Sequence, residues 1–170
     1  MILIILLSGC INEEGNTTPK ENIFLIEDYD ISFSFPKDWE KVTEDNPFDL
    51  QCTNSKSYAS VFAYRKIDLG EGQTPLTLFE SQNEDLFSKR GNVKVISEKK
   101  VSEFENKKIH SVLYSAEKEG VKNYYYCNLI EFEDADVFAW LLFTAVPSES
   151  ERYMGVWDAI AASANYTEYE

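Results

Sequence analysis

The chain has 170 residues, enough for one domain with a sizeable hydrophobic core that needs no metal or disulfide to fold. Its 44% hydrophobic and 14% aromatic content argue against a long disordered chain. The net charge of −14 would repel both a phosphate backbone and anionic headgroups. We therefore expect no nucleic-acid partner, and any membrane attachment must come from something other than a basic patch.

The N-terminus begins with a continuous apolar run, residues 1–7, followed by Ser8, Gly9 and Cys10. Such a run is typical of a secretory signal and is much shorter than the roughly 20 residues that span a bilayer. The sequence Leu7-Ser8-Gly9-Cys10 resembles the lipobox of prokaryotic lipoproteins. This resemblance implies a signal peptide over 1–9, cleavage before Cys10 and a lipid on the Cys10 thiol. The alternative is an N-terminal strand that happens to contain a cysteine.

Residues 10–22 are polar and have no apolar periodicity, so we expect a flexible tether between the lipidated cysteine and a folded domain over 23–170. The localisation expected from these features is a lipid-anchored protein facing the extracytoplasmic side of a cell membrane. Asn16 and Asn165 each begin a glycosylation sequon, a motif that often arises by chance.

The first half of the domain predicts three strands and then a helix. Alternating apolar and polar residues mark strands over 30–35 and 48–53, and aromatic and β-branched residues mark a third over 58–67. Thr74 is a good N-cap with Pro75 at the first helical position. A helix is therefore expected over 75–90, with Gly91 supplying a left-handed exit.

The second half predicts four strands and a final helix. Strands are expected over 93–103 and 107–116, and a hairpin joins 121–133 to 136–146. The last of these strands is apolar at nearly every position, which indicates a central strand covered on both faces. Ser148 and Glu151 have the spacing of a capping box and predict a helix over 148–164.

The order of these elements, together with the opening strand Ile31 to Phe35, Pro36 and the nearby Trp39, resembles the PsbP-like fold. That fold is named after an extrinsic subunit of the photosynthetic oxygen-evolving complex and is shared by prokaryotic lipoproteins. The resemblance implies an α+β domain, an α/β/α sandwich with a mainly antiparallel central sheet and helices packed on its faces. It transfers no functional residue, because members of one fold bind different partners.

The inventory of reactive residues predicts no catalytic residue, no metal site and no cofactor. His110 is the sole histidine, and no nucleophile elbow or phosphate-binding loop is present in the sequence. The acidic group at the predicted hairpin tip lacks the spacing of an EF-hand, so we interpret it as solvated charge. Its members are Glu131, Glu133, Asp134 and Asp136.

Aromatic residues and cysteines supply the remaining candidates. Trp39, Tyr124, Tyr125 and Tyr126 are the candidates for an exposed binding surface, the alternative for the tyrosines being cross-strand packing beneath a helix. Cys52 and Cys127 could form a disulfide in an exported domain, or could be two buried free thiols.

The sequence therefore favours a lipid-anchored envelope protein whose non-catalytic domain binds an unknown envelope protein or glycan. The rival hypotheses are an envelope polymer hydrolase that uses paired carboxylates and a purely structural envelope protein.

Overall fold

The computed structural model describes residues 21–168. The predicted signal peptide, the lipidation site Cys10, the sequon at Asn16 and nearly all of the predicted tether lie outside these residues. The described chain forms two α-helices, two short 3-10 helices and ten strands. In chain order they are β1 (Asn22–Ile26), η1 (Glu27–Tyr29), β2 (Ile31–Phe35), β3 (Glu40–Lys41), β4 (Leu50–Thr53), β5 (Ser57–Arg65), η2 (Lys66–Asp68), α1 (Pro75–Ser88), β6 (Gly91–Phe104), β7 (Lys107–Lys118), β8 (Val121–Phe132), β9 (Val137–Ala145), α2 (Pro147–Ser163) and β10 (Asn165–Tyr166).

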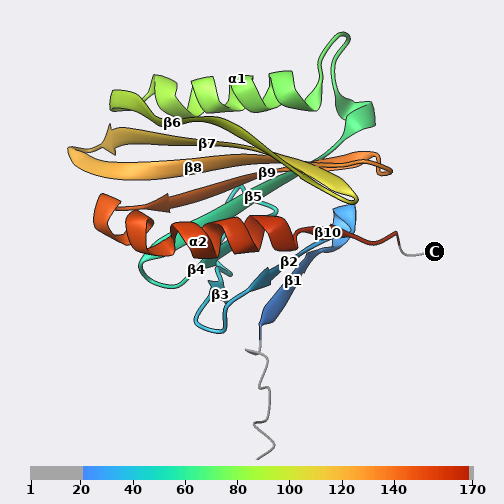
Figure 1. Ribbon diagram of the computed structural model, residues 1–170, viewed down its shortest axis with the longest axis horizontal. Helices are drawn as coiled ribbons and strands as arrows, with labels where there is room; N and C mark the ends of the chain where they lie inside the picture. Colours follow the sequence, from blue (N-terminus) through green and yellow to red (C-terminus); the bar gives the residue numbers. More distant parts are fainter. Residues whose placement is uncertain (1–20, 169–170) are drawn as a thin grey trace, which may run out of the picture.

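Seven strands form one antiparallel sheet in the order β3-β4-β5-β9-β8-β7-β6, and it separates α1 from α2 (Figure 1). Strand β9 is the fourth of the seven, and its residues 137–143 are all buried. This confirms the prediction from its unbroken apolar sequence. The α+β class, the antiparallel sheet and the placement of helices on its faces are confirmed as well.

Alternation along each strand creates two separate cores. On β9, Ala139, Leu141 and Phe143 enter the core beneath α2, whereas Phe138, Trp140 and Leu142 enter the core beneath α1. Successive side chains of a strand point to opposite faces, so one apolar strand supplies both cores.

The α2 side of the main sheet has a second cover. Strands β1, β2 and β10 form a small antiparallel sheet that lies beside α2 (Figure 1). Ile31, Phe33 and Phe35 of β2 are completely buried in the same core as Trp157 of α2. A helix and a three-stranded sheet together therefore close this face, whereas in residues 21–168 α1 is the one helix on the other face.

Several local predictions differ from the structure. Strands β1, β3 and β10 were not predicted, because each is short and forms only by pairing with a partner strand. Helix α2 starts at Pro147, and no side chain caps it. The predicted capping box is therefore wrong: proline, which lacks an N–H and has a preset φ, suits the first helical position.

The start of α1 agrees with the prediction from the sequence, whereas its end does not. The N-terminal prediction is confirmed, since Thr77 N donates to Thr74 Oγ1 (3.2 Å) and Thr74 N donates to Thr77 Oγ1 (2.8 Å). The helix ends at Ser88, and the left-handed residue after it is Asn92 (φ 50°), the second residue of β6, rather than Gly91. Asparagine tolerates this conformation better than most residues.

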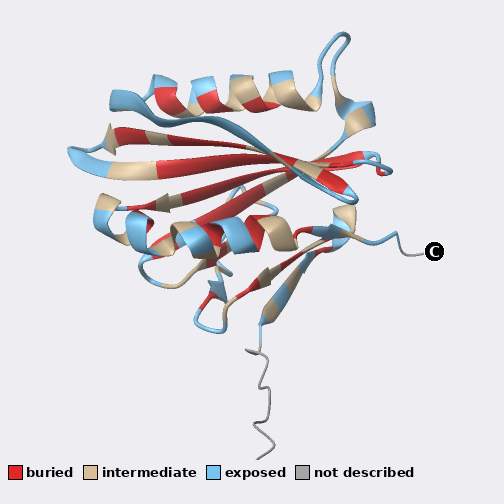
Figure 2. Cartoon of the chain, in the orientation of Figure 1, coloured by how far each residue is buried: buried red, intermediate tan, exposed pale blue. Residues whose placement is uncertain are grey.

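Strand β6 differs from the other long strands in its exposure. Its side chains are exposed along almost its whole length, whereas β7, β8 and β9 are largely buried (Figure 2). Within residues 21–168 its side chains are exposed on both faces, and several of those at the surface are apolar. These are Val93, Val95, Ile96, Val101 and Phe104.

Candidate functional site

The aromatic residues predicted to form an exposed binding surface are mostly buried. Trp39 has no exposed surface, and it packs against Phe35 and Phe143 in the core beneath α2. Tyr125 and Tyr126 are 3% and 7% exposed, and Tyr124 is half-buried against the same core as Trp39. The predicted surface is therefore wrong as a set, because a second sheet covers Trp39 and the helices cover the tyrosine strand.

Burial of Tyr126 affects both the hydrogen bonding and the pKa of its hydroxyl group. Its ring lies among Phe143 and Trp157, and its hydroxyl donates a hydrogen bond to Asp158 Oδ1 (2.7 Å). Burial is the main cause that raises the pKa of Tyr126 to about 12, and Asp158 raises it further. The hydroxyl group thus acts as a structural link between β8 and α2.

The two cysteines lie in different cores. Cys52 of β4 packs beneath α2, and Cys127 of β8 packs beneath α1, so the sheet itself separates their side chains. Both are buried free thiols, and no disulfide joins them in residues 21–168. Burial raises the pKa of Cys52 to about 12 and also raises the pKa of Cys127. The candidate disulfide is therefore not formed, and the alternative of two buried thiols describes the structure.

A concave cleft lies on the α1 side of the main sheet, between α1 and strands β4, β5 and β9. It has a volume of about 610 Å³, within the range of small-molecule sites. The cleft exists because the sheet is wider than helix α1, which packs on this face. A helix about 10 Å across covers roughly two strands spaced about 4.8 Å apart, so α1 alone leaves part of a seven-stranded sheet open.

The floor of this cleft is aromatic and aliphatic. Phe62 of β5 stacks on Trp140 of β9, with ring centroids 5.6 Å apart and an interplanar angle of 9°. Phe48 extends the floor, since its ring lies 4.9 Å from that of Phe62. Aliphatic side chains of Leu86 in α1 and Leu142 in β9 add to this apolar lining. These strand residues share one face of the sheet because they occupy alternate positions.

Polar side chains surround this floor. Gln51 Nε2 donates to Ser60 Oγ (3.0 Å) on the β4–β5 side, and Gln82 and Asp85 line the α1 side. The other polar lining side chains are those of Lys56, Arg90, Lys118, Asn123, Tyr58 and Thr144.

Two buried donors at the cleft have no hydrogen-bond partner among the described residues. Trp140 is 5% exposed, yet its indole Nε1 meets no acceptor. Arg90 Nε is likewise buried and without a partner, although Nη1 of the same guanidinium donates to Leu86 O. The Arg90 guanidinium lies 5.0 Å from the centroid of the Tyr125 ring. This cation–π contact holds the guanidinium beside the part of β8 that lines the cleft. Buried donors are usually paired, so two unpaired ones at one cleft indicate a place for an acceptor.

Of the four aromatic candidates, Tyr125 alone lines the cleft. Phe62, Trp140 and Arg90 were not singled out from the sequence. The sequence did contain a signal for the aromatic floor of the cleft, because Tyr58, Phe62 and Tyr64 occupy positions of β5 that share one face. Nothing in the local sequence indicated that, among residues 21–168, α1 would be the one helix packed on this face.

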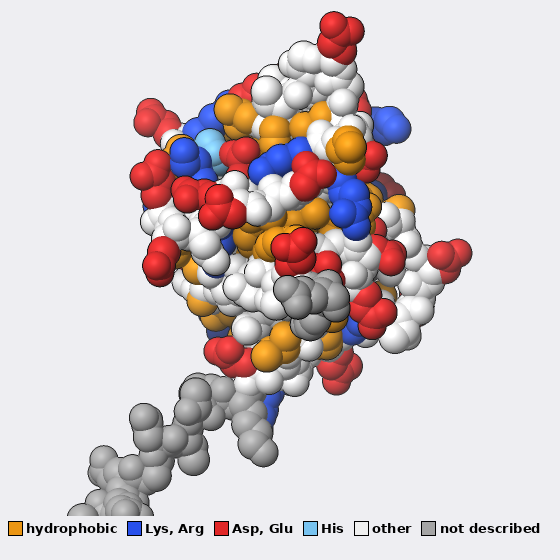
Figure 3. Space-filling model, turned by 90° about the vertical axis from the view of Figure 1, so that its right-hand side faces the viewer, with side chains coloured by type: hydrophobic (Ala, Val, Ile, Leu, Met, Phe, Trp, Pro, Cys, Tyr) orange, Lys and Arg blue, Asp and Glu red, His pale blue; other side chains and the backbone are white. Residues whose placement is uncertain are grey.

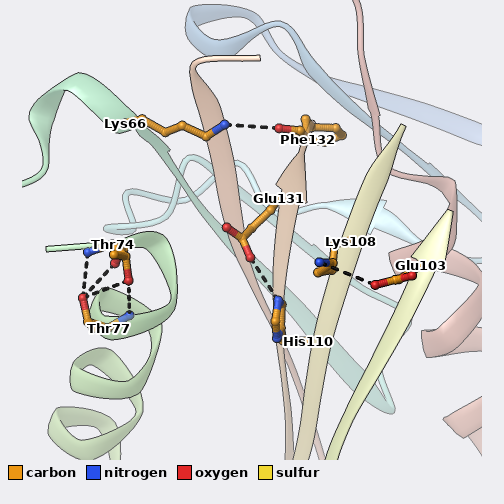
Figure 4. Close-up of polar contacts among 8 residues, drawn as sticks. All are labelled: Lys66, Thr74, Thr77, Glu103, Lys108, His110, Glu131 and Phe132. Carbon is orange, nitrogen blue, oxygen red and sulfur yellow. Dashed lines mark hydrogen bonds and ion pairs between the residues drawn. The ribbon is translucent and has the colours of Figure 1, made fainter. Parts of the chain in front are cut away.

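A second polar group lies near the opposite end of the main sheet (Figure 4). His110 Nε2 lies 3.0 Å from Glu131 Oε1, and Lys108 Nζ lies 3.5 Å from Glu103 Oε1. Lys66 Nζ donates to the backbone oxygens of Phe132 (3.2 Å) and Ala135 (2.6 Å), which attaches η2 to the β8–β9 hairpin. These contacts tie neighbouring strands and loops together and bring no nucleophile to His110.

The hairpin tips at this end carry many carboxylates, spread over a face with cationic and apolar side chains between them (Figure 3). Glu133, Asp134 and Asp136 are exposed at the β8–β9 tip, while Glu131 faces His110. Among residues 21–168, no three His, Cys, Asp or Glu side chains are placed to hold a metal ion.

Comparison with solved structures identifies the architecture. The structure of cyanobacterial PsbP from Synechocystis superposes with a TM-score of 0.62 at 9% identity, covering 90% of this chain and 96% of that one. The chain has the PsbP-like fold. LpqN of Mycobacterium tuberculosis, described as involved in cell envelope biogenesis, gives a TM-score of 0.63 at 13% identity and covers 88% of this chain and 91% of its own.

A third neighbour is the Ran-binding protein Mog1p of Saccharomyces cerevisiae, with a TM-score of 0.57 at 10% identity over 87% of this chain and 96% of that one. At such identities the likeness concerns the fold alone. No protein-family model matches the chain, and no curated protein sequence matches it significantly. Within residues 21–168 no helix is long and apolar enough to cross a bilayer.

Proposed function

We propose that this protein is a non-catalytic binding module, held on the extracytoplasmic side of a membrane by a lipid on Cys10, and that the cleft beside α1 is its ligand site. The observation that carries the binding role is the composition of the cleft. An apolar, aromatic floor is combined with a few polar groups, and a buried indole N–H lacks a partner among the described residues. This combination is the usual one for small-molecule sites.

A binding role also agrees with the fold neighbours. The yeast protein is a Ran-binding protein, and the mycobacterial one is described as involved in cell envelope biogenesis. Since fold does not determine function, these neighbours support a binding role without naming a ligand. The anchor proposal has a different basis, namely the apolar run and Leu7-Ser8-Gly9-Cys10 in the sequence.

The rival hydrolase requires two carboxyl groups on either side of a scissile bond, about 5–10 Å apart. Among the described residues that line the cleft, Asp85 is the one carboxylate. The cleft therefore gives the hydrolase hypothesis no support. A purely structural role gives no reason for an open aromatic cleft with unpaired donors.

The binding proposal can be tested with N-phenyl-1-naphthylamine, a neutral probe whose fluorescence rises in apolar surroundings. The full chain carrying Cys10→Ser, which removes the lipid acceptor, is titrated with this probe. We expect saturable binding that Gln82→Trp abolishes, because the large ring would occupy the cleft from α1. Ser81→Trp is the matched control, since Ser81 is the exposed neighbour on the same helix and does not line the cleft. Absence of saturable binding, or equal binding by both variants, would reject the cleft as the ligand site.

A further inference from the structure

We infer that the ligand of the cleft is an amphiphilic anion, with an apolar body that lies on the aromatic floor and an anionic head group at one defined end. The inference rests on the proposed function of the cleft and adds to it the chemical class of the ligand and its orientation.

The first observation is the local charge. The chain as a whole carries −14, yet the described side chains that line the cleft include three cations and one carboxylate. The cations are Lys56, Arg90 and Lys118, and the carboxylate is Asp85. A cleft with an excess of positive charge in a strongly acidic protein attracts small anions and focuses them there.

The second observation is that the strand register gathers the three cations at one end of the main sheet. Gly91 pairs with Glu117, so the preceding Arg90 and the following Lys118 lie next to each other across the β6–β7 ladder. At the same end, Ala145 of β9 pairs with both Ser57 and Tyr124, and Lys56 immediately precedes Ser57. The cations therefore come from three separate segments and lie at the same end of the cleft.

The third observation concerns which face these side chains occupy. Ala116 of β7 enters the core beneath α1, so by alternation Lys118 lies on that face as well. The adjacent Glu117 lies on the other face and accepts a hydrogen bond from Asn92 Nδ2 (2.7 Å). The nearest carboxylate on the strand is thus turned away from the cleft, and it leaves Lys118 available to a ligand.

The unpaired donors supply the fourth observation. Trp140 Nε1 and Arg90 Nε are both buried at the cleft, and neither has an acceptor among the described residues. An anionic oxygen is the strongest acceptor for such donors. A ligand without an acceptor oxygen would leave both donors unpaired. A cationic ligand would in addition place a positive charge beside the three cations of the cleft.

An amphiphilic anion can reach the cleft as a free molecule or as a membrane lipid. The test therefore uses both sources with the same Cys10→Ser chain. Laurate and dodecyltrimethylammonium, which share chain length and differ in charge, compete with N-phenyl-1-naphthylamine below their micelle concentrations. In the second arm, phosphatidylcholine vesicles with and without phosphatidylglycerol are incubated with the chain, and native mass spectrometry of the supernatant detects any extracted lipid.

We expect laurate to displace the probe at about tenfold lower concentration than the cationic amphiphile, and added salt to reduce the difference. Arg90→Gln and Lys118→Gln should each weaken laurate binding several-fold, a much larger loss than either causes in binding of the neutral probe. Lys89→Gln is the matched control, because Lys89 neighbours Arg90, is exposed and does not line the cleft. Extraction of phosphatidylglycerol in the second arm would support the inference with a membrane lipid as the source.

Equal displacement by the two amphiphiles overturns the inference, as does a Lys89→Gln chain that loses laurate binding as much as Arg90→Gln does. Probe binding would persist in both cases, and the proposed cleft function would stand. A parent chain that does not bind the probe would count against the proposed function instead. Calorimetric titration with laurate would then decide the inference directly, and no heat of binding would overturn it.

Discussion

Trp157 of α2 donates its indole N–H to the hydroxyl of Ser57 at the start of β5, over a distance of 3.0 Å, and both side chains are fully buried. One hundred residues separate them in sequence. The bond links α2 to the end of the main sheet at which the cleft cations lie on the opposite face.

Ser57→Ala should destabilise the fold by about 1–3 kcal/mol, because the buried indole N–H would lose its acceptor. Urea unfolding followed by circular dichroism measures the change. An unfolding midpoint equal to that of the parent would show that the indole finds another acceptor or that the bond contributes nothing.

The two helix starts give a second prediction. Thr74→Ala should lower the free energy of unfolding by about 1 kcal/mol, because Thr74 caps α1. Ser148→Ala should change it by less than about 0.5 kcal/mol, because Ser148 is exposed and caps nothing in the structure. Similar losses of stability in both variants would show that Ser148 does cap α2, as the sequence predicted.

Thiol reactivity gives a third prediction. In the Cys10→Ser chain, Cys52 and Cys127 should react slowly with a thiol reagent at mildly alkaline pH, because both are buried and their pKa values are raised. Both should react at once after denaturation without reductant. A chain with no reactive thiol after denaturation would instead contain the disulfide that the structure lacks.

The pH dependence of stability follows from buried phenols. Burial raises the pKa of Tyr64 and of Tyr126 from 10.0 to about 12. Between these values the unfolded chain loses these protons while the folded chain keeps them, so stability that is present below pH 10 is lost as the pH rises towards 12. Burial lowers the pKa of Lys107 below 10.5, and this acts in the opposite sense only at pH values below that one.

Urea unfolding across this alkaline range, with phenolate absorbance recorded in parallel, checks the prediction. Tyr64→Phe should remove part of the late phenolate signal. Constant stability up to pH 12 would contradict the assigned burial of these hydroxyls.

The anchor prediction is tested by fractionation of cells. Cys10→Ser should move the protein from the membrane to the soluble fraction, because a serine cannot form the thioether. Ser8→Ala is the control, since it keeps a small residue before the cysteine and should leave the protein in the membrane. Retention of the Cys10→Ser chain in the membrane would show that the resemblance to a lipobox is misleading.

The sequence by itself determined the elements whose signal is local. The unbroken apolar run of β9 marked the central strand, and Thr74 with Pro75 marked the start of α1, because capping and alternation depend on neighbouring residues. The PsbP-like order of elements followed from the same signals. Short strands such as β10 had no such signal, since Asn165 forms a strand only by pairing with Ser32, far away in the chain.

Tertiary structure alone decided what covers each face. Strand alternation places Tyr125 on the face opposite Tyr124 and Tyr126 whether the strand is buried or exposed. Whether those two faces are covered depends on α1 and α2. Cys52 and Cys127 each show a buried strand pattern, yet only the assembled sheet places them on opposite faces. The cleft arises because one helix is narrower than a seven-stranded sheet, and its cations come to the same end only through the register of the strands. Burial is a property of the packed layers, and a local pattern cannot specify which layer will be missing.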